Sequence, residues 1–108
     1  MKGTEKQIAW AQDILENARK FWNESKDESI AALEEMEAKK GNGKAQSMID
    51  DIRTASALLN CDCSQTIIDN RDAFNGCAIF KQTVMGCNPK ATAKAQARAA
   101  SALIKSIS

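Results

Sequence analysis

The strongest helical signal in the chain is TEKQIAWAQDILENARKFWNESK, residues 4–26. Thr4 and Gln7 stand three residues apart, as in a capping box, where the hydroxyl and the amide side chain satisfy free backbone N–H groups reciprocally. Apolar residues then recur at alternating steps of three and four, at Ile8, Ala11, Leu15, Ala18 and Trp22. This period is that of one helix face, so the stretch predicts an amphipathic helix of about five or six turns.

Two more helices are expected before residue 61. Ser25 and Glu28 form a second capping box and predict the start of a new helix. Residues 41–43, Gly-Asn-Gly, then break the chain, and an apolar stripe predicts a third helix over residues 44–60. We therefore expect a three-helix core over residues 4–60, whose first two helices form an αα-hairpin.

The next segment gives weaker signals. Residues 61–87 contain all four cysteines and a strong turn signal at Asn75-Gly76, so we expect this segment to be irregular. Its β-branched and aromatic residues leave a short β-hairpin open within residues 65–85.

A basic, alanine-rich helix is expected over residues 88–108. Asn88 suits the N-cap position and Pro89 the first helical position. Alanine favours helix strongly but buries little area, so few apolar side chains anchor this helix and it needs a partner to hold it.

Together these elements predict the fold class. We expect a mainly α single domain over residues 1–108, a small helical bundle made of the three-helix core plus the C-terminal helix. If residues 65–85 pair as a hairpin, the class becomes α+β.

Composition narrows the function classes. The 108 residues contain no His, which removes the commonest general base and any Ser–His or Cys–His nucleophile pair. No apolar stretch approaches the roughly 18–20 residues of a membrane span, and the polar residues 1–6 lack the apolar region of a signal peptide. We expect a protein that is not an enzyme, lies in the cytoplasm and has no membrane partner.

The four cysteines are either free thiols or metal ligands. Four thiolates are able to hold a structural zinc ion. The Cys-X-Cys spacing here lacks the second closely spaced pair of the usual zinc knuckle, so we expect no cofactor and keep zinc as a minor alternative. The candidate ligands are Cys61, Cys63, Cys77 and Cys87.

Charge is unevenly distributed along the chain. Residues 1–72 hold ten bases and all fourteen acids, whereas residues 73–108 hold five bases and no acid. Three of these bases are spaced by four and lie on one face of the expected last helix, and a fourth stays near it. The candidate binding residues of this basic stripe are Lys90, Lys94, Arg98 and Lys105.

The basic stripe has two interpretations. In the first it binds nucleic-acid phosphates, although no aromatic residues interleave the bases as in a single-strand stacking groove. In the second it docks on the acidic residues of the helical core, in the same molecule or in another copy, which would make a homo-oligomer. Those acidic residues are Glu34, Glu35, Glu37, Asp50 and Asp51.

Two short motifs carry a resemblance to known proteins. Residues 3–11, GTEKQIAWA, and residues 68–71, IDNR, resemble motifs of a group of small uncharacterised proteins from phages, plasmids and their bacterial hosts. In that group the residue before the second motif is commonly Trp, whereas this chain has Ile67. The group has no settled biochemical activity, so the resemblance implies a mobile-element setting in a bacterial cell and no particular reaction.

The motifs also supply candidate binding residues. Lys6 and Trp10 are four residues apart and lie on one side of the first helix. Arg71 has a structural interpretation, locked over a helix end or an aromatic ring, and a binding interpretation beside it. The candidates from the two motifs are Lys6, Trp10, Asp69, Asn70 and Arg71.

We expect a small non-catalytic binding protein of phage or mobile-element origin. It would act by stoichiometric binding to a host protein or protein–nucleic-acid complex, and inhibition of a host defence system fits this description. Two alternatives stay open: a self-associating helical module without a nucleic-acid role, and a small zinc-stabilised nucleic-acid-binding domain.

Overall fold

Helices make up most of the chain that the structure describes, which is residues 2–84 and 88–107 of a computed structural model. In chain order they are α1 (Glu5–Lys40), α2 (Lys44–Leu58), α3 (Ser64–Asp69), α4 (Arg71–Ile79), the 3-10 helix η1 (Phe80–Val84) and α5 (Pro89–Ile107). The predicted mainly α bundle is confirmed. None of the helices in these residues is long and apolar enough to cross a membrane.

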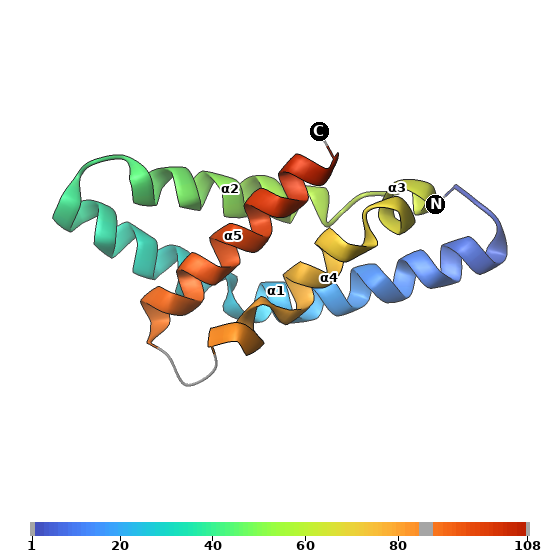
Figure 1. Cartoon of the computed structure of the whole chain (residues 1–108), viewed down its shortest axis with the longest axis horizontal. Coiled ribbons are helices and arrows are strands. Elements are labelled where there is room, and N and C mark those ends of the chain that lie inside the picture. The colour runs from blue at the N-terminus through green and yellow to red at the C-terminus, as the bar shows by residue number, and fades with distance from the viewer. Residues whose placement is uncertain (1, 85–87, 108) are drawn as a thin grey trace.

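The helices form a flat, two-layered bundle. Figure 1 shows α4 and α5 lying across α1 and α2, with the turn between α1 and α2 at one end of the long axis. The molecule measures 49 × 28 × 17 Å along its principal axes, and the shortest dimension is that of two packed helices.

Helix α1 is one continuous helix of 36 residues, so the predicted αα-hairpin between residues 4–26 and the next helix is wrong. Its predicted capping box is confirmed, since the Gln7 N–H donates to Thr4 Oγ1 at 3.2 Å and the Thr4 N–H to Gln7 Oε1 at 3.1 Å. The predicted helix start at Ser25 is wrong, because the apolar stripe of α1 continues through this position with the same period. Ser25 and Ser29 are buried on the same face as Trp22 and do not begin a new helix.

The segment between α2 and α5 is helical wherever the structure describes it. The predicted irregular segment over residues 61–87 and the possible hairpin within residues 65–85 are both wrong for residues 64–84, where α3, α4 and η1 follow one another. The Asn75-Gly76 turn signal falls inside α4. Phe74 and Cys77 are fully buried there, and their packing outweighs the roughly 1 kcal/mol that a glycine costs a helix.

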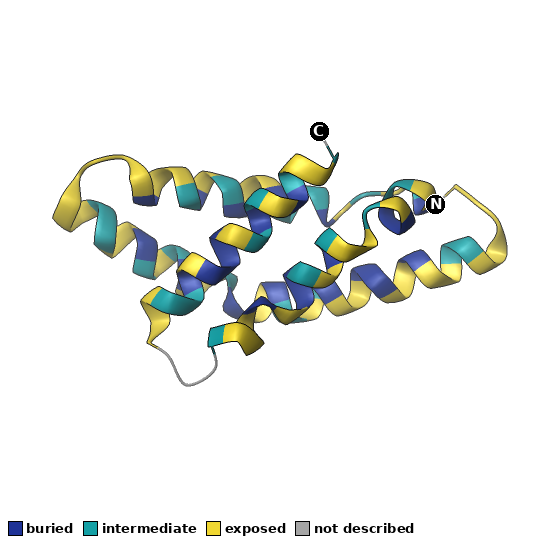
Figure 2. Cartoon of the chain, viewed as in Figure 1, coloured by how far each residue is buried: buried dark blue, intermediate teal, exposed yellow. Residues whose placement is uncertain are grey.

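Helix α5 occupies the centre of the bundle and packs against α1, α2 and α4. Ala93, Ala100 and Leu103 are fully buried, and the small alanine side chains allow neighbouring helices to approach closely. In Figure 2 the buried residues of α5 run along its inner side. The partner that this helix needs is the rest of the chain, whose helices cover its apolar face.

Trp22 is the largest fully buried side chain and joins three parts of the core. Its indole N–H donates to Ser56 Oγ at 2.8 Å, and its ring meets Phe80 edge to face with centroids 5.8 Å apart. The Gln96 amide of α5 donates to the Trp22 carbonyl at 3.2 Å. These contacts fix α5 on α1 and thereby fix which side of α5 faces outward.

Candidate anion-binding site

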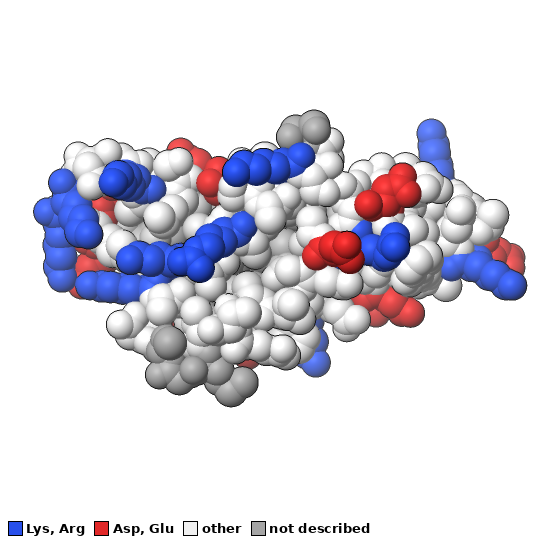
Figure 3. All heavy atoms as spheres, in the orientation of Figure 1, with Lys and Arg blue, Asp and Glu red and all other residues white. Residues whose placement is uncertain are grey.

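The outward side of α5 carries the predicted basic stripe. Lys90, Lys94 and Arg98 are exposed, and in residues 2–84 and 88–107 no ion pair joins them to a carboxylate. Figure 3 shows Lys and Arg side chains gathered over α5 and over the end of the molecule where α1 turns into α2. Lys105, on the same helix, is exposed as well.

Four of the five acidic residues named above have other partners in the chain. The partners are Arg53 for Glu34 (3.9 Å), Lys39 for Glu35 (3.3 Å), the Gly43 N–H for Glu37 (2.9 Å) and the Gln46 amide for Asp50 (3.1 Å). None of the ion pairs among the described residues joins Lys90, Lys94 or Arg98 to these carboxylates, and docking of the stripe on the acidic residues stays a prediction. The charges of Lys90, Lys94 and Arg98 are therefore not paired with these carboxylates.

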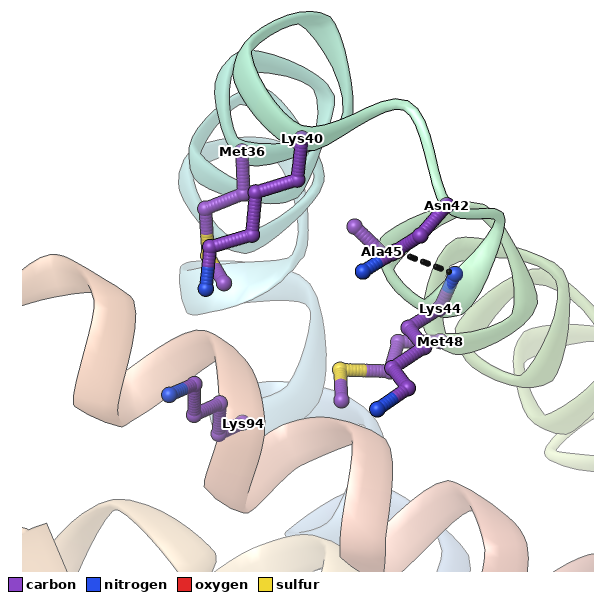
Figure 4. Close-up of a pocket in the computed structure, with 7 residues that line it drawn as sticks. All are labelled: Met36, Lys40, Asn42, Lys44, Ala45, Met48 and Lys94. Carbon is purple, nitrogen blue, oxygen red and sulfur yellow. Dashed lines mark hydrogen bonds between the residues drawn. The ribbon is translucent and has the colours of Figure 1, made fainter.

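A pocket of about 170 Å³ lies where α5 meets the α1–α2 turn. Lys40 comes from the end of α1, Lys44 from the start of α2 and Lys94 from α5, and Figure 4 shows the three side chains around one hollow. Met36, Met48, Ala45 and Asn42 complete the lining. No carboxylate lines this pocket, and the Glu37 carboxylate binds the N–H of Gly43, which precedes Lys44.

The Gly-Asn-Gly turn brings two of these lysines together. Gly41 ends α1 in the left-handed conformation (φ +60°) and Gly43 precedes α2 with φ +79°, which other residues rarely adopt. Asn42 Oδ1 accepts from the Lys44 N–H at 3.0 Å and stabilises the turn. Because the chain reverses over three residues, Lys40 and Lys44 face the same pocket from opposite sides.

The start of α2 adds a weaker attraction for anions. The N-cap Gly43 offers no side-chain acceptor, and the first turn of α2 contains no acidic residue. Free backbone N–H groups and the helix dipole favour negative charge at such an end. The Glu37 carboxylate, bonded to the Gly43 N–H, offsets part of this effect.

A second hollow of about 190 Å³ adjoins the pocket and shares Met48 and Lys94 with it. Ala97, Arg98 and Ser101 complete its lining. The two hollows therefore lie next to each other between α2 and α5, and we call the pair the basic groove. Its cations are Lys40, Lys44, Lys94 and Arg98, and its apolar floor is Met36, Met48 and Ala97.

Only part of the basic groove was predicted from the sequence. Lys94 and Arg98 belong to the predicted stripe, whereas Lys90 is exposed on the same helix but does not line either hollow. Lys40 and Lys44 were missed, because a lysine at a helix end is explained by the helix dipole alone. The available signal was a pair of lysines on either side of a three-residue turn.

The two motifs of the resemblance meet at the other end of the molecule. The Arg71 guanidinium lies over the Trp10 ring, 5.6 Å from its centroid, and its Nη1 donates to the Ile68 carbonyl at 3.0 Å. These are the contacts that the structural interpretation expects, with Arg71 over an aromatic ring and a helix end, and the binding interpretation stays a prediction. Trp10 keeps 48% of its surface exposed, and Lys6, four residues before it, is exposed as well.

The remaining polar residues of the second motif also have partners in this chain. Asp69 Oδ1 accepts from the Gln65 amide at 2.7 Å. The Asn70 amide donates to the Thr66 carbonyl at 2.7 Å, and Asn70 Oδ1 accepts from the Ser106 hydroxyl of α5. Asp69 and Asn70 thus order α3 and attach it to the end of α5.

Gly3 of the first motif has a steric role. A Cβ atom at this position would lie 2.1 Å from Ser64 Oγ, and its φ of +135° is unfavourable for other residues. The Ser64 N–H and hydroxyl both donate to the Lys2 carbonyl, so the chain before α1 is bonded to the start of α3. Residues of both motifs therefore attach the N-terminal segment and α1 to α3 and α4, and we call this region the Trp10–Arg71 junction.

The predicted zinc ligands do not gather among the described residues. Burial raises the pKa of the Cys77 thiol to about 12, while a hydrogen bond with the Thr66 side chain lowers the pKa of Cys63. Cys61 and Cys63 are partly exposed near α3. Residues 2–84 and 88–107 contain no group of three or more potential metal ligands, and Cys87 lies outside them.

Comparison of the chain with protein-family models, curated proteins and solved structures found no match.

Proposed function

We propose that this protein acts by binding nucleic acid, and that the basic groove contacts the phosphate backbone. The observation that carries this proposal is the set of three lysines, Lys40, Lys44 and Lys94, around a pocket that no carboxylate lines. Like charges repel, so such an arrangement is relieved by an anion, and a phosphate is the common anion of this kind on a macromolecule.

The continuation of the groove favours a polyanion over a single small ion. Arg98 lines the adjoining hollow, and Lys90 and Lys105 extend the positive face along α5. A string of phosphates is able to meet these cations in turn, with release of counterions at each contact. Arg98 adds a planar donor group suited to phosphate oxygens.

The composition and the resemblance support the biological setting of this proposal. Without His, the chain lacks the commonest general base, so we propose binding and not catalysis. The motifs at residues 3–11 and 68–71 support a phage or mobile-element origin and a bacterial host cell. The protein would then occupy host nucleic acid, or a host complex that presents nucleic acid, in a stoichiometric manner.

The test is a binding titration with a fluorescent 20-nucleotide oligomer at several salt concentrations. The variant K40Q/K44Q/K94Q removes the pocket cations, and K2Q/K20Q/K81Q removes three exposed lysines that do not line the groove. We expect the pocket variant to bind roughly 10- to 100-fold more weakly and to lower the slope of log K against log salt by about 2, since each single-strand phosphate contact contributes about 0.7.

The control variant has the same net charge, so it separates a local site from general attraction. Equal losses in the two variants would contradict the proposal, as would tighter binding to vesicles of anionic lipid than to the oligomer. Light scattering on the protein alone completes the test: an oligomer that dissociates at high salt would favour the self-associating module instead.

A further inference from the structure

We infer that the basic groove takes a single strand, with unpaired bases lying on the thioethers of Met36 and Met48. This inference rests on the proposed function and goes beyond it, because it assigns the groove floor to the bases and the groove walls to the phosphates. Two observations support it: the lysines converge on one pocket, and apolar residues line the same hollows.

The convergence of the lysines suits a flexible strand. Lys40, Lys44 and Lys94 surround one pocket of about 170 Å³ and do not follow a straight line. A stiff duplex presents its phosphates on a convex surface at regular spacing. A single strand is able to turn one phosphate into the pocket and continue toward Arg98 in the adjoining hollow.

The floor of the groove suits bases. Met36 and Met48 are partly exposed in the lining of the first hollow, and Met48 and Ala97 line the second. Apolar surface beside three ammonium groups makes no contact with a phosphate, whereas thioethers contact aromatic rings favourably, by about 0.3–1.5 kcal/mol each. No aromatic residue stands between the lysine and arginine residues of α5. The fold instead places methionines from α1 and α2 where an aromatic residue would contact the bases of the strand.

Two Met–base contacts predict a measurable preference. We compare three ligands at one salt concentration: a 20-nucleotide single strand, its duplex, and an abasic strand of equal length that keeps the phosphates and lacks the bases. From the range above, the intact strand should bind roughly 3- to 150-fold more tightly than the abasic strand. It should also bind more tightly than the duplex.

Variants of the methionines and variants of the lysines should separate the contacts with bases from the contacts with phosphates. M36Q/M48Q should remove the preference for intact over abasic strand and leave the salt slope unchanged, whereas M36L/M48L, which keeps the apolar surface and lacks the sulfur atoms, should keep only part of the preference. K94Q should lower the slope for both strands equally. Thermal unfolding followed by circular dichroism checks that each variant folds. If the double glutamine variant does not fold, M48Q alone, at the methionine that lines both hollows, should reduce the preference.

The outcomes distinguish this inference from the proposed function. Equal binding of intact and abasic strands, or tighter binding of the duplex, overturns the inference and leaves nucleic-acid binding in place. If the wild-type protein binds none of the three ligands, both the inference and the proposed function are overturned.

Discussion

The basic groove and the Trp10–Arg71 junction lie at opposite ends of the molecule. They differ in whether their cationic side chains have partners within the chain. At the junction, the Arg71 guanidinium lies over Trp10 and donates to the Ile68 carbonyl. In the groove, Lys94 and its neighbours surround a pocket without a carboxylate. A charge that the fold pairs contributes to stability, whereas a charge that the fold leaves unpaired is available to a partner.

This difference assigns different roles to residues that the sequence presents alike. The motifs at residues 3–11 and 68–71 contain the more distinctive residue pattern, yet most of their polar side chains bond within the chain. The groove residues have no distinctive pattern and lie on three separate helices. We therefore expect substitutions at the junction to change stability and substitutions in the groove to change binding.

The largest expected effect on stability is at Gly3. Gly3→Ala should lower the free energy of unfolding by about 2 kcal/mol, because its Cβ would meet the buried Ser64 and because its φ is positive. Gly76→Ala is the matched control: it lies inside α4 with open space around it and should stabilise by about 0.5–1 kcal/mol. Urea unfolding measures both, and a Gly3→Ala protein as stable as the wild type would show that the junction is loose.

A somewhat smaller loss is expected at Arg71. Arg71→Ala should destabilise by about 1–2 kcal/mol, because it removes a hydrogen bond from a charged group and the contact with the Trp10 ring. A double-mutant cycle with Trp10→Ala isolates the ring contact, for which we expect a coupling of about 0.5–1 kcal/mol. Zero coupling would mean that Trp10 is exposed for another purpose.

The cap of α1 should contribute about 1 kcal/mol. Thr4→Ala removes the acceptor of the Gln7 N–H, and N-cap substitutions of this kind typically cost that amount. Thr4→Ser keeps the hydroxyl and serves as the control in the same chemical denaturation series. If Ala and Ser at this position gave equal stability, the capping box would not hold the start of α1.

The smallest effect on stability is expected in the groove. K40Q/K44Q/K94Q should change the free energy of unfolding by no more than about 0.5 kcal/mol, since these exposed lysines make no ion pair among the described residues. Removal of their mutual repulsion should make any change slightly stabilising at low salt. A loss of more than about 1 kcal/mol would show that the groove lysines support the fold.

Local periodicity was enough to predict the class of the fold but not its connections. The stripe from Ile8 to Trp22 and the cap at Thr4 gave the start of the first helix correctly, but not its end at Lys40. The helix start predicted at Ser25 was wrong, because the sequence alone does not distinguish a serine buried on a helix face from a serine at an N-cap. At Gly76 the packing of Phe74 against the core overrode a local turn preference.

The candidate site was half predicted for a related reason. The spacing of Lys90, Lys94 and Arg98 sets one helix face without knowledge of the rest of the fold. Lys40, Lys44 and the floor residue Met36 join that face only because α1 and α2 reverse direction beside α5. Such a meeting of distant segments depends on tertiary packing, which periodicity along the chain does not reveal.

The most direct test of the contrast between the two ends is an NMR titration of the ¹⁵N-labelled protein with the single-stranded oligomer. We predict chemical-shift changes in the amides of residues 40–48 and 94–98, with the Trp10 indole N–H and the Arg71 amide unchanged. Shifts that centre on Trp10 and Arg71 and spare the groove would contradict the account.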